Sequence, residues 1–385
     1  MKDIKKIDKT LLVFIIIYSV FGLMMILSAS SASTVLRYNV SSNHFFLRQL
    51  IVLILSYIAG FFILVIPTKR YKGISYLGVL GIIFLLILVL VKGEITNNAQ
   101  SWFEIGPFNL QPSEFAKTVL ILFMAVFYHN LTYQNNRNLS LYFIPVCVSL
   151  IMTFLIAKQP DWGSAAILLA ISGLTFLSVP MIRKNMSKIM KLGMVALALV
   201  AIVLMFKGGD IFSSEKLSRF NFQSPCKRYQ EDTGYQVCNG FIAINNGGLT
   251  GVGIGNSTQK YLYLPESHTD FIFAILVEEL GLLVGIGVLI LYALLLYRLL
   301  KIAKEAYILR NSILAYGTFW YFTFHIIINL CGMLSILPLT GVPLPLMSYG
   351  GSSTLNFIAM LFISQRVAIE NKNAKYNMEI KKLAN

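Results

Sequence analysis

Two thirds of the way along the chain, one short segment combines groups that could do acid–base chemistry. Leu264 to Ala274 reads LPESHTDFIFA, and Asp270 stands where a long polar stretch meets an apolar one. A carboxylate there can take the proton from a hydroxyl nucleophile or hold a divalent cation. Asp is also a good helix N-cap, so capping is the alternative role. We expect Asp270 to be catalytic and His268 to lie beside it.

A second segment puts opposite charges at the start of an apolar stretch. Gln111, Pro112 and Ser113 lead into Glu114, and Lys117 follows three residues later. Because proline suits the first turn of a helix, a helix is expected to begin here. Glu114 and Lys117 then share a helix face and form an ion pair. Such a pair in apolar surroundings usually faces a cavity; the alternative is an anchor for the helix end at a water boundary.

Two further segments place polar groups beside glycine and proline. Asp161 lies in the sequence QPDWG and either contributes to a site or caps the next helix. The run TGVPLPLMSYGGSS, residues 340–353, has two prolines and three glycines. Irregular backbone of this kind is tolerated within a membrane only where it is buried in protein or lines a cavity. Three of its side chains can form hydrogen bonds with a ligand: Ser348, Tyr349 and Ser352.

The elements that carry these segments are apolar. Of 385 residues, 56% are hydrophobic and 13% are charged, whereas a soluble domain has about 25% charged residues. The apolar blocks are about 18 to 22 residues long, enough to cross roughly 30 Å of hydrocarbon. We predict an all-α polytopic membrane protein, a single transmembrane domain over residues 1–385. Its ten expected spans are 11–31, 49–66, 74–92, 112–130, 140–157, 163–180, 188–206, 270–297, 312–337 and 348–368.

The placement of charge predicts the orientation in the membrane. The net charge of +15 comes largely from Lys and Arg in alternate loops and at both ends of the chain, which is the positive-inside pattern and not a nucleic-acid-binding face. Both termini are therefore expected in the cytoplasm, and the polar stretch 207–269 before the eighth span outside it. Cys226 and Cys238 share that stretch, so a disulfide is open to them but is not fixed by the sequence. Glu278 and Glu279, about two turns into the eighth span, need partners within the bundle.

The four polar segments, in this order and with this number of spans, resemble the SEDS family, the RodA/FtsW peptidoglycan glycosyltransferases. The resemblance covers almost the whole chain and is closer to the FtsW type in the segment GYQ at 234–236 and in AINNGGL at 243–249. It implies polymerisation of lipid II into undecaprenyl-diphosphate-linked glycan outside the cytoplasmic membrane of a bacterium. It also implies a class B penicillin-binding protein as partner, in cell division or elongation.

The resemblance carries roles to single residues. The family's essential aspartate falls on Asp270, and its cavity-lining Glu and Lys fall on Glu114 and Lys117. One departure is Ser101, which stands where the family commonly has arginine before the tryptophan, here Trp102; a phosphate contact at that position must be absent or supplied elsewhere. The substrate-binding residues expected are Trp102, Gln111, Ser113, Glu114, Lys117, Asp161, His268, Ser348, Tyr349 and Ser352.

The chemistry of such a transfer explains why one carboxylate suffices. A sugar hydroxyl is a poor nucleophile, and Asp270 can accept its proton. The diphosphate leaves readily if cations or a metal meet its growing charge, so Mg²⁺ or Mn²⁺ at Asp270 is an open possibility. Cations that could contact the diphosphate are Lys117, Lys216, Arg219, Lys227, Arg228 and Lys260.

Two other functions fit a membrane protein of this kind. A lipid II flippase would need a polar route through the whole bilayer, whereas the polar segments here gather toward one side. A non-catalytic scaffold of the cell-wall synthesis machinery would tolerate neutralisation of Asp270. The sequence favours the enzyme over both.

Overall fold

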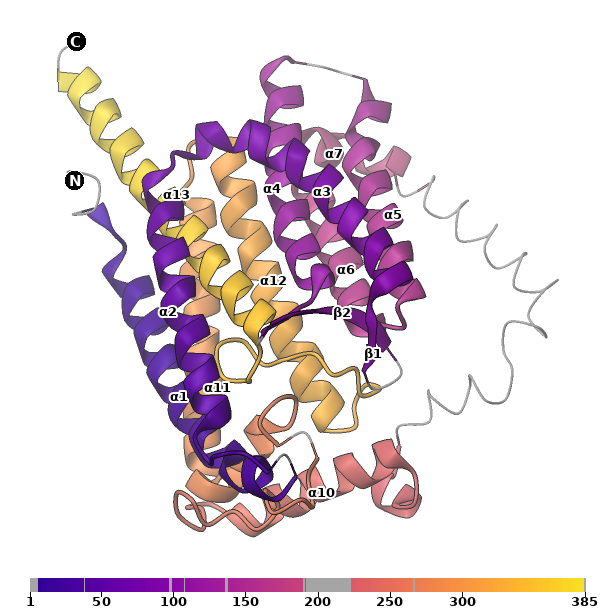
Figure 1. Cartoon of the computed structure of the whole chain (residues 1–385). Coiled ribbons are helices and arrows are strands. Elements are labelled where there is room, and N and C mark those ends of the chain that lie inside the picture. Colours follow the sequence, from indigo (N-terminus) through magenta and orange to yellow (C-terminus); the bar gives the residue numbers. More distant parts are fainter. Residues whose placement is uncertain are drawn as a thin grey trace.

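The protein is a bundle of helices that run side by side (Figure 1). The computed structural model describes residues 6–37, 39–96, 99–106, 108–135, 138–189, 191, 223–265 and 267–383. By length and composition, eight of the helices in these ranges could cross a membrane. They are α1 (Lys9–Leu36), α2 (His44–Val65), α3 (Tyr71–Lys92) with the 3-10 turn before it, α4 (Pro112–Tyr133), α5 (Ile144–Lys158) together with the 3-10 helix η3 (Leu139–Phe143), α11 (Ile272–Lys304), α12 (Leu309–Met333) and α13 (Gly351–Leu383).

The predicted all-α polytopic membrane fold is confirmed. The expected span 163–180 appears as the shorter apolar helix α6 (Trp162–Ser178), followed by α7 (Pro180–Lys184). The expected seventh span, 188–206, lies almost entirely outside the described residues. The other nine expected spans each have a helix at their place, and α4 begins at Pro112 as predicted. Both α11 and α13 continue well beyond the predicted ends at 297 and 368.

The main departure from the prediction is a break inside the eighth span. Gly281 has a φ of 85°, a non-helical conformation within α11 that suits glycine because it has no Cβ. Before it, every residue from 272 to 279 is buried; after it, the buried residues recur every three or four positions along one face. The span predicted as 270–297 is therefore an interior helix joined at Gly281 to a second helix with one exposed face.

A small antiparallel sheet joins α3 to α4, where only a loop was expected. Its strands are β1 (Glu94–Thr96), β2 (Ala99–Ile105) and β3 (Phe108–Leu110), in the order β1-β2-β3. In β2–β3, Phe103 pairs with Leu110 and Ile105 with Phe108. The sheet delivers the chain directly to Gln111 at the start of α4.

The polar stretch before α11 is folded over the part described. It contains a 3-10 turn, η4 (Pro225–Arg228), and α10 (Asp232–Gly247), and a disulfide between Cys226 and Cys238 joins the two. This region lies at one end of the bundle, the α10 end (Figure 1). The first turns of α1 and the last turns of α13 lie at the opposite end, here called the termini end.

Candidate active site

The segment that carries Asp270 lies against the irregular run 340–349. The Ser348 hydroxyl donates to the Thr269 backbone oxygen at 2.6 Å, and the Tyr349 amide donates to the His268 oxygen at 2.9 Å. The same Ser348 oxygen accepts from the Leu344 amide at 2.8 Å. Because one hydroxyl both donates and accepts, it fixes the fold of its own run and that run's position against Asp270. The sequence placed these residues in a shared site, and the structure brings them together.

Asp270 itself is held through its backbone and lies close to a glycine. Its carbonyl oxygen accepts from the Asn329 side chain at 2.9 Å, and the same amide donates to the Val342 oxygen at 2.8 Å. A Cβ built on Gly341, which has a φ of +68°, would lie 3.4 Å from Asp270 Oδ2. The residue is half-buried. Phe271 stands at the N-cap position of α11, directly after Asp270, so the capping role stays an alternative for Asp270.

His268 belongs to an aromatic cluster beside the site. Its ring stacks on Phe45 with centroids 4.6 Å apart and lies 5.7 Å from the Tyr349 ring. Burial, together with the nearby Arg37 charge, lowers the pKa of His268 to about 4. The imidazole is therefore neutral near pH 7 and contributes ring packing to the site, not positive charge.

The predicted ion pair between Glu114 and Lys117 is confirmed, and it is buried. Lys117 Nζ lies 2.6 Å from Glu114 Oε1, with exposed fractions of 0% and 2%. Lys117 Nζ also lies 3.1 Å from His325 Nε2. Since an ammonium can only donate, Nε2 must accept, and the imidazole proton is on Nδ1. Nδ1 lies 3.4 Å from the Pro343 oxygen, so the pair connects through His325 to the run 340–349.

One face of α12 therefore supplies three residues that the sequence analysis missed. Tyr321 donates to Glu114 Oε2 at 3.4 Å, His325 contacts Lys117, and Asn329 holds Asp270. The three are spaced four apart along the helix, so they share one face. That spacing of polar residues within an apolar span was the signal in the sequence, because intramembrane polar groups face the interior of a bundle.

A second hydrogen-bonded group joins the starts of α4, α6 and α13. Asp161 caps α6: its side chain accepts a hydrogen bond from the Ser164 backbone amide at 3.0 Å. This is the capping role that the sequence analysis gave as one of two alternatives. The other carboxylate oxygen of Asp161 accepts from Gln111 Nε2 at 3.0 Å and from the Ser113 hydroxyl at 2.9 Å. The Ser352 hydroxyl accepts a hydrogen bond from the backbone amide of Gln111 at 3.0 Å. Asp161 thus both caps a helix and fixes two of the predicted binding residues.

The position of the missing arginine is occupied by a buried hydroxyl. Ser101 is 1% exposed and donates to the Gln159 oxygen at 3.2 Å. Trp102, next along β2, is half-buried and pairs with Glu94. Successive side chains of a strand point to opposite faces, so Ser101 faces the bundle and Trp102 the other side of the sheet.

Several cations considered for the diphosphate already have acidic partners. Lys260 pairs with Glu279 at 2.9 Å, where both are buried, and Arg228 pairs with Glu231 at 2.8 Å. Lys227 is exposed. Lys216 and Arg219 lie outside the described residues.

The two glutamates of the eighth span have the partners that they were expected to need. Besides its ion pair with Lys260, Glu279 accepts from the Ser28 hydroxyl, which lies 2.7 Å from Oε1 and 2.6 Å from Oε2. Glu278 accepts from Asn246, Ser257 and Thr258. Both carboxylates therefore bind residues of the polar stretch at the α10 end and do not continue a polar route beyond Gly281.

The donor set limits how a cation could be held. Among the residues that the structure describes, no three His, Cys, Asp or Glu side chains gather as metal ligands. Mg²⁺ usually binds through one or two carboxylates and takes its other ligands from water and substrate phosphates. Asp270 fits a cation shared with a diphosphate and does not fit a cation held by protein alone.

Comparison with known proteins agrees with this arrangement. Residues 8–373 match the model of the FtsW/RodA/SpoVE family, described as cell cycle proteins. The chain is 36% identical to the probable peptidoglycan glycosyltransferase FtsW of Bacillus subtilis, over 97% of this chain and 94% of the relative. It is 32% identical to stage V sporulation protein E of the same organism, over 92% and 94% of the two chains.

Two solved structures share the fold over nearly the whole chain. A chain of a peptidoglycan synthase complex that coordinates polymerization and crosslinking has a TM-score of 0.74 and 25% identity, covering 95% of this chain and 98% of that one. RodA of Thermus thermophilus has a TM-score of 0.65 and 26% identity, with coverage of 94% and 96%. The predicted family is confirmed: the chain belongs to the FtsW/RodA/SpoVE family and is of the FtsW type.

Proposed function

We infer that this protein is a peptidoglycan glycosyltransferase that polymerises lipid II at the outer face of the bacterial cytoplasmic membrane. The observation that carries the proposal is the position of Asp270, which three neighbouring hydrogen bonds hold against the run 340–349 while its carboxylate stays half-buried. The α10 end faces outward, and both termini lie in the cytoplasm. The relatives of the FtsW type support this activity.

The reaction needs one base and a stabilised leaving group. Asp270 accepts the proton of the attacking sugar hydroxyl as that oxygen bonds to the anomeric carbon of the lipid-linked donor. The bond from that carbon to the diphosphate breaks, and the lipid diphosphate leaves with the electron pair. Asn329 and Ser348 donate hydrogen bonds to the backbone oxygens of Asp270 and Thr269. These bonds hold the carboxylate in place and so lower the free-energy cost of reaching the reactive geometry.

A divalent cation fits the second role at the same residue. Asp270 would supply one carboxylate ligand, and the donor's diphosphate would supply others. A cation held in this way would offset the charge of the leaving diphosphate. Lys117 does not take this role in the arrangement described, because its ammonium is fully buried between Glu114 and His325.

The protein works with a class B penicillin-binding protein. The support is the likeness to a chain of a complex that coordinates polymerization and crosslinking. The flippase alternative is less well supported, since Glu278 and Glu279, the carboxylates expected to lie deeper, are bound by residues at the α10 end.

The decisive experiment is lipid II polymerisation by the purified complex, with transpeptidation blocked. Asp270→Asn keeps the shape and removes the base, and we expect polymer to fall by at least about 100-fold. Asp232→Asn, at an exposed position at the start of α10, is the matched control and stays active. Thermal melting of both variants establishes that they are folded. If Asp270→Asn still makes polymer, the base must lie elsewhere. If the partner alone makes the same amount of polymer, the non-catalytic scaffold function is favoured.

A further inference from the structure

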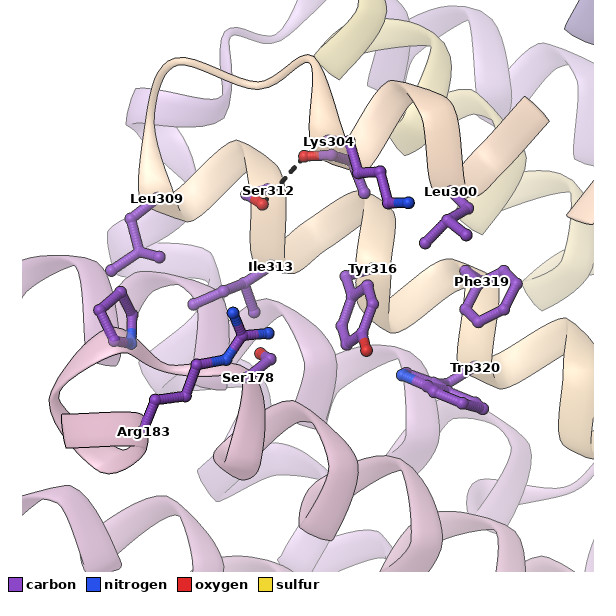
Figure 2. Close-up of a pocket in the computed structure, with 12 residues that line it drawn as sticks. Ser178, Arg183, Leu300, Lys304, Leu309, Ser312, Ile313, Tyr316, Phe319 and Trp320 are labelled. Atoms are coloured by element: carbon purple, nitrogen blue, oxygen red, sulfur yellow. Dashed lines mark hydrogen bonds between the residues drawn. The ribbon is translucent and has the colours of Figure 1, made fainter. Parts of the chain in front are cut away.

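A cavity lies at the termini end, at the opposite end of the bundle from Asp270. Its volume is about 630 Å³, and it lies between the end of α6 with α7 and the facing ends of α11 and α12 (Figure 2). None of the residues assigned to the glycosyl transfer lines it. The residues used below are Arg183 and Lys304 at its rim and Tyr316, Phe319 and Trp320 along its wall.

The rim carries positive charge that no acidic side chain among the described residues neutralises. Arg183 and Lys304 are both exposed, and in the described part of the chain neither forms an ion pair. Figure 2 shows them on different sides of the cavity, Arg183 on α7 and Lys304 at the end of α11. The described residues of the lining include no Asp or Glu. Nearby Glu305 pairs with Lys301 at 4.0 Å. Two unpaired cations in the lining of one cavity give it a positive charge that suits an anionic group.

The wall below the rim is aromatic and follows one face of α12. Tyr316 packs on Trp320 with ring centroids 5.8 Å apart, and Phe319 packs on Trp320 at 4.9 Å. Trp320 Nε1 is buried and has no hydrogen-bond partner among the residues described. Aromatic rings of this kind offer a large apolar surface for contact with an acyl chain.

The dimensions match one lipid leaflet. Ser312, near the mouth, and Trp320 are eight residues apart on α12, or about 12 Å along its axis. Half of a bilayer's hydrocarbon core is about 15 Å thick. A phosphate at the level of Arg183 and Lys304 would therefore place its acyl chain along Tyr316, Phe319 and Trp320.

We propose that this groove binds an anionic phospholipid of the leaflet at the termini end. The phosphate lies between Arg183 and Lys304, and one acyl chain covers the aromatic wall. Basic hollows between membrane helices on the cytoplasmic side are suited to acidic headgroups, because that leaflet carries the negative surface potential. The bound lipid would contact α7, α11 and α12 together and so stabilise their packing at this point.

Fluorescence of Trp320 tests the proposal without any assay of activity. The full chain is reconstituted in phosphatidylcholine with increasing fractions of phosphatidylglycerol brominated in its acyl chains, or of equally brominated phosphatidylcholine. The Trp320 contribution is the difference between the native chain and Trp320→Phe. We expect half-maximal quenching at about tenfold lower fraction of the anionic lipid, the preference that two cations near the surface provide.

Charge variants separate a built site from general attraction. Arg183→Gln with Lys304→Gln should abolish the preference for the anionic lipid. Lys375→Gln with Lys381→Gln removes the same charge from exposed positions on α13 and should leave it intact. Equal quenching by both lipids, or weak quenching by both because a protein segment fills the groove, would overturn the proposal. An equal loss of the preference for anionic lipid in the two double variants would also overturn the proposal. Melting curves establish that each variant is folded.

Discussion

Asn329 supports Asp270 from a neighbouring helix, through a side-chain amide that donates to the backbone oxygens of Asp270 and Val342. The two acceptors belong to segments more than seventy residues apart in sequence, so one side chain fixes their relative position. Asn329 is 5% exposed, and water cannot easily replace it there. The placement of the proposed base therefore depends on α12 as well as on the segment that carries it.

Replacing Asn329 with alanine should lower the rate of lipid II polymerisation by about tenfold or more. The change leaves two carbonyl oxygens without their donor, which costs about 1–3 kcal/mol of stability, and it loosens Asp270. The loss should appear mainly in kcat, since the residue positions the base. Asn256→Ala, in an exposed turn, is the control. An unchanged kcat in folded Asn329→Ala protein would contradict the positioning role.

Gly341→Ala tests how closely the irregular run approaches Asp270. The φ of +68° is unfavourable for any residue with a Cβ, by about 1–2 kcal/mol, and the added methyl would contact Asp270 Oδ2. We expect lower activity with a modest loss of melting temperature. In Gly173→Ala the added Cβ has no atom within 4 Å, so this change in α6 should stabilise the protein slightly. Full activity of Gly341→Ala would mean that the run can move away.

The buried ion pair should show strong coupling between its partners. Glu114→Gln or Lys117→Met alone leaves one buried charge unpaired, and we expect a loss of about 3–5 kcal/mol in the free energy of unfolding. The double variant should lose much less than the sum of the two. Unfolding of the four proteins in detergent gives the interaction energy directly. Additive losses would show that the charges are not coupled.

The stability of the protein should depend on pH through His268. Burial lowers its folded-state pKa to about 4 from an ordinary 6.5, so the unfolded chain binds the extra proton first. Stability is therefore fully present above pH 6.5 and is lost as the pH falls toward 4, by about 3 kcal/mol in all. His268→Phe should remove most of this dependence between pH 7.5 and 5. The same pH dependence in the native protein and the variant would contradict the shift.

The sequence predicted the parts of the fold that depend on apolar length. Spans such as 112–130 and 312–337 could be recognised because each crosses a bilayer and carries few charges. The end of α13 could not, because its last turns are polar and hydropathy cannot distinguish a continuing helix from a tail. The break in α11 was also missed: an apolar stretch on both sides of Gly281 looks like one span, and only tertiary contacts select the kink.

The site was predicted unevenly, for a physical reason. Asp270, Ser348 and Tyr349 stand beside proline, glycine and polar clusters, which mark irregular backbone in any sequence. His325 and Asn329 lie inside an apolar helix, where a single polar residue resembles ordinary packing until its partner is known. The partners Lys117 and Asp270 come from distant parts of the chain, and no local pattern predicts that meeting.

The break at Gly281 also bears on how the membrane itself acts on the site. The helix before it is enclosed by protein on all sides, while the helix after it exposes one face, so a change in bilayer thickness acts directly only on the latter. Hydrophobic mismatch is usually relieved by tilting of such a helix, and a glycine at the junction lets the tilt end there. We therefore expect the geometry around Asp270 to be insensitive to differences in lipid chain length.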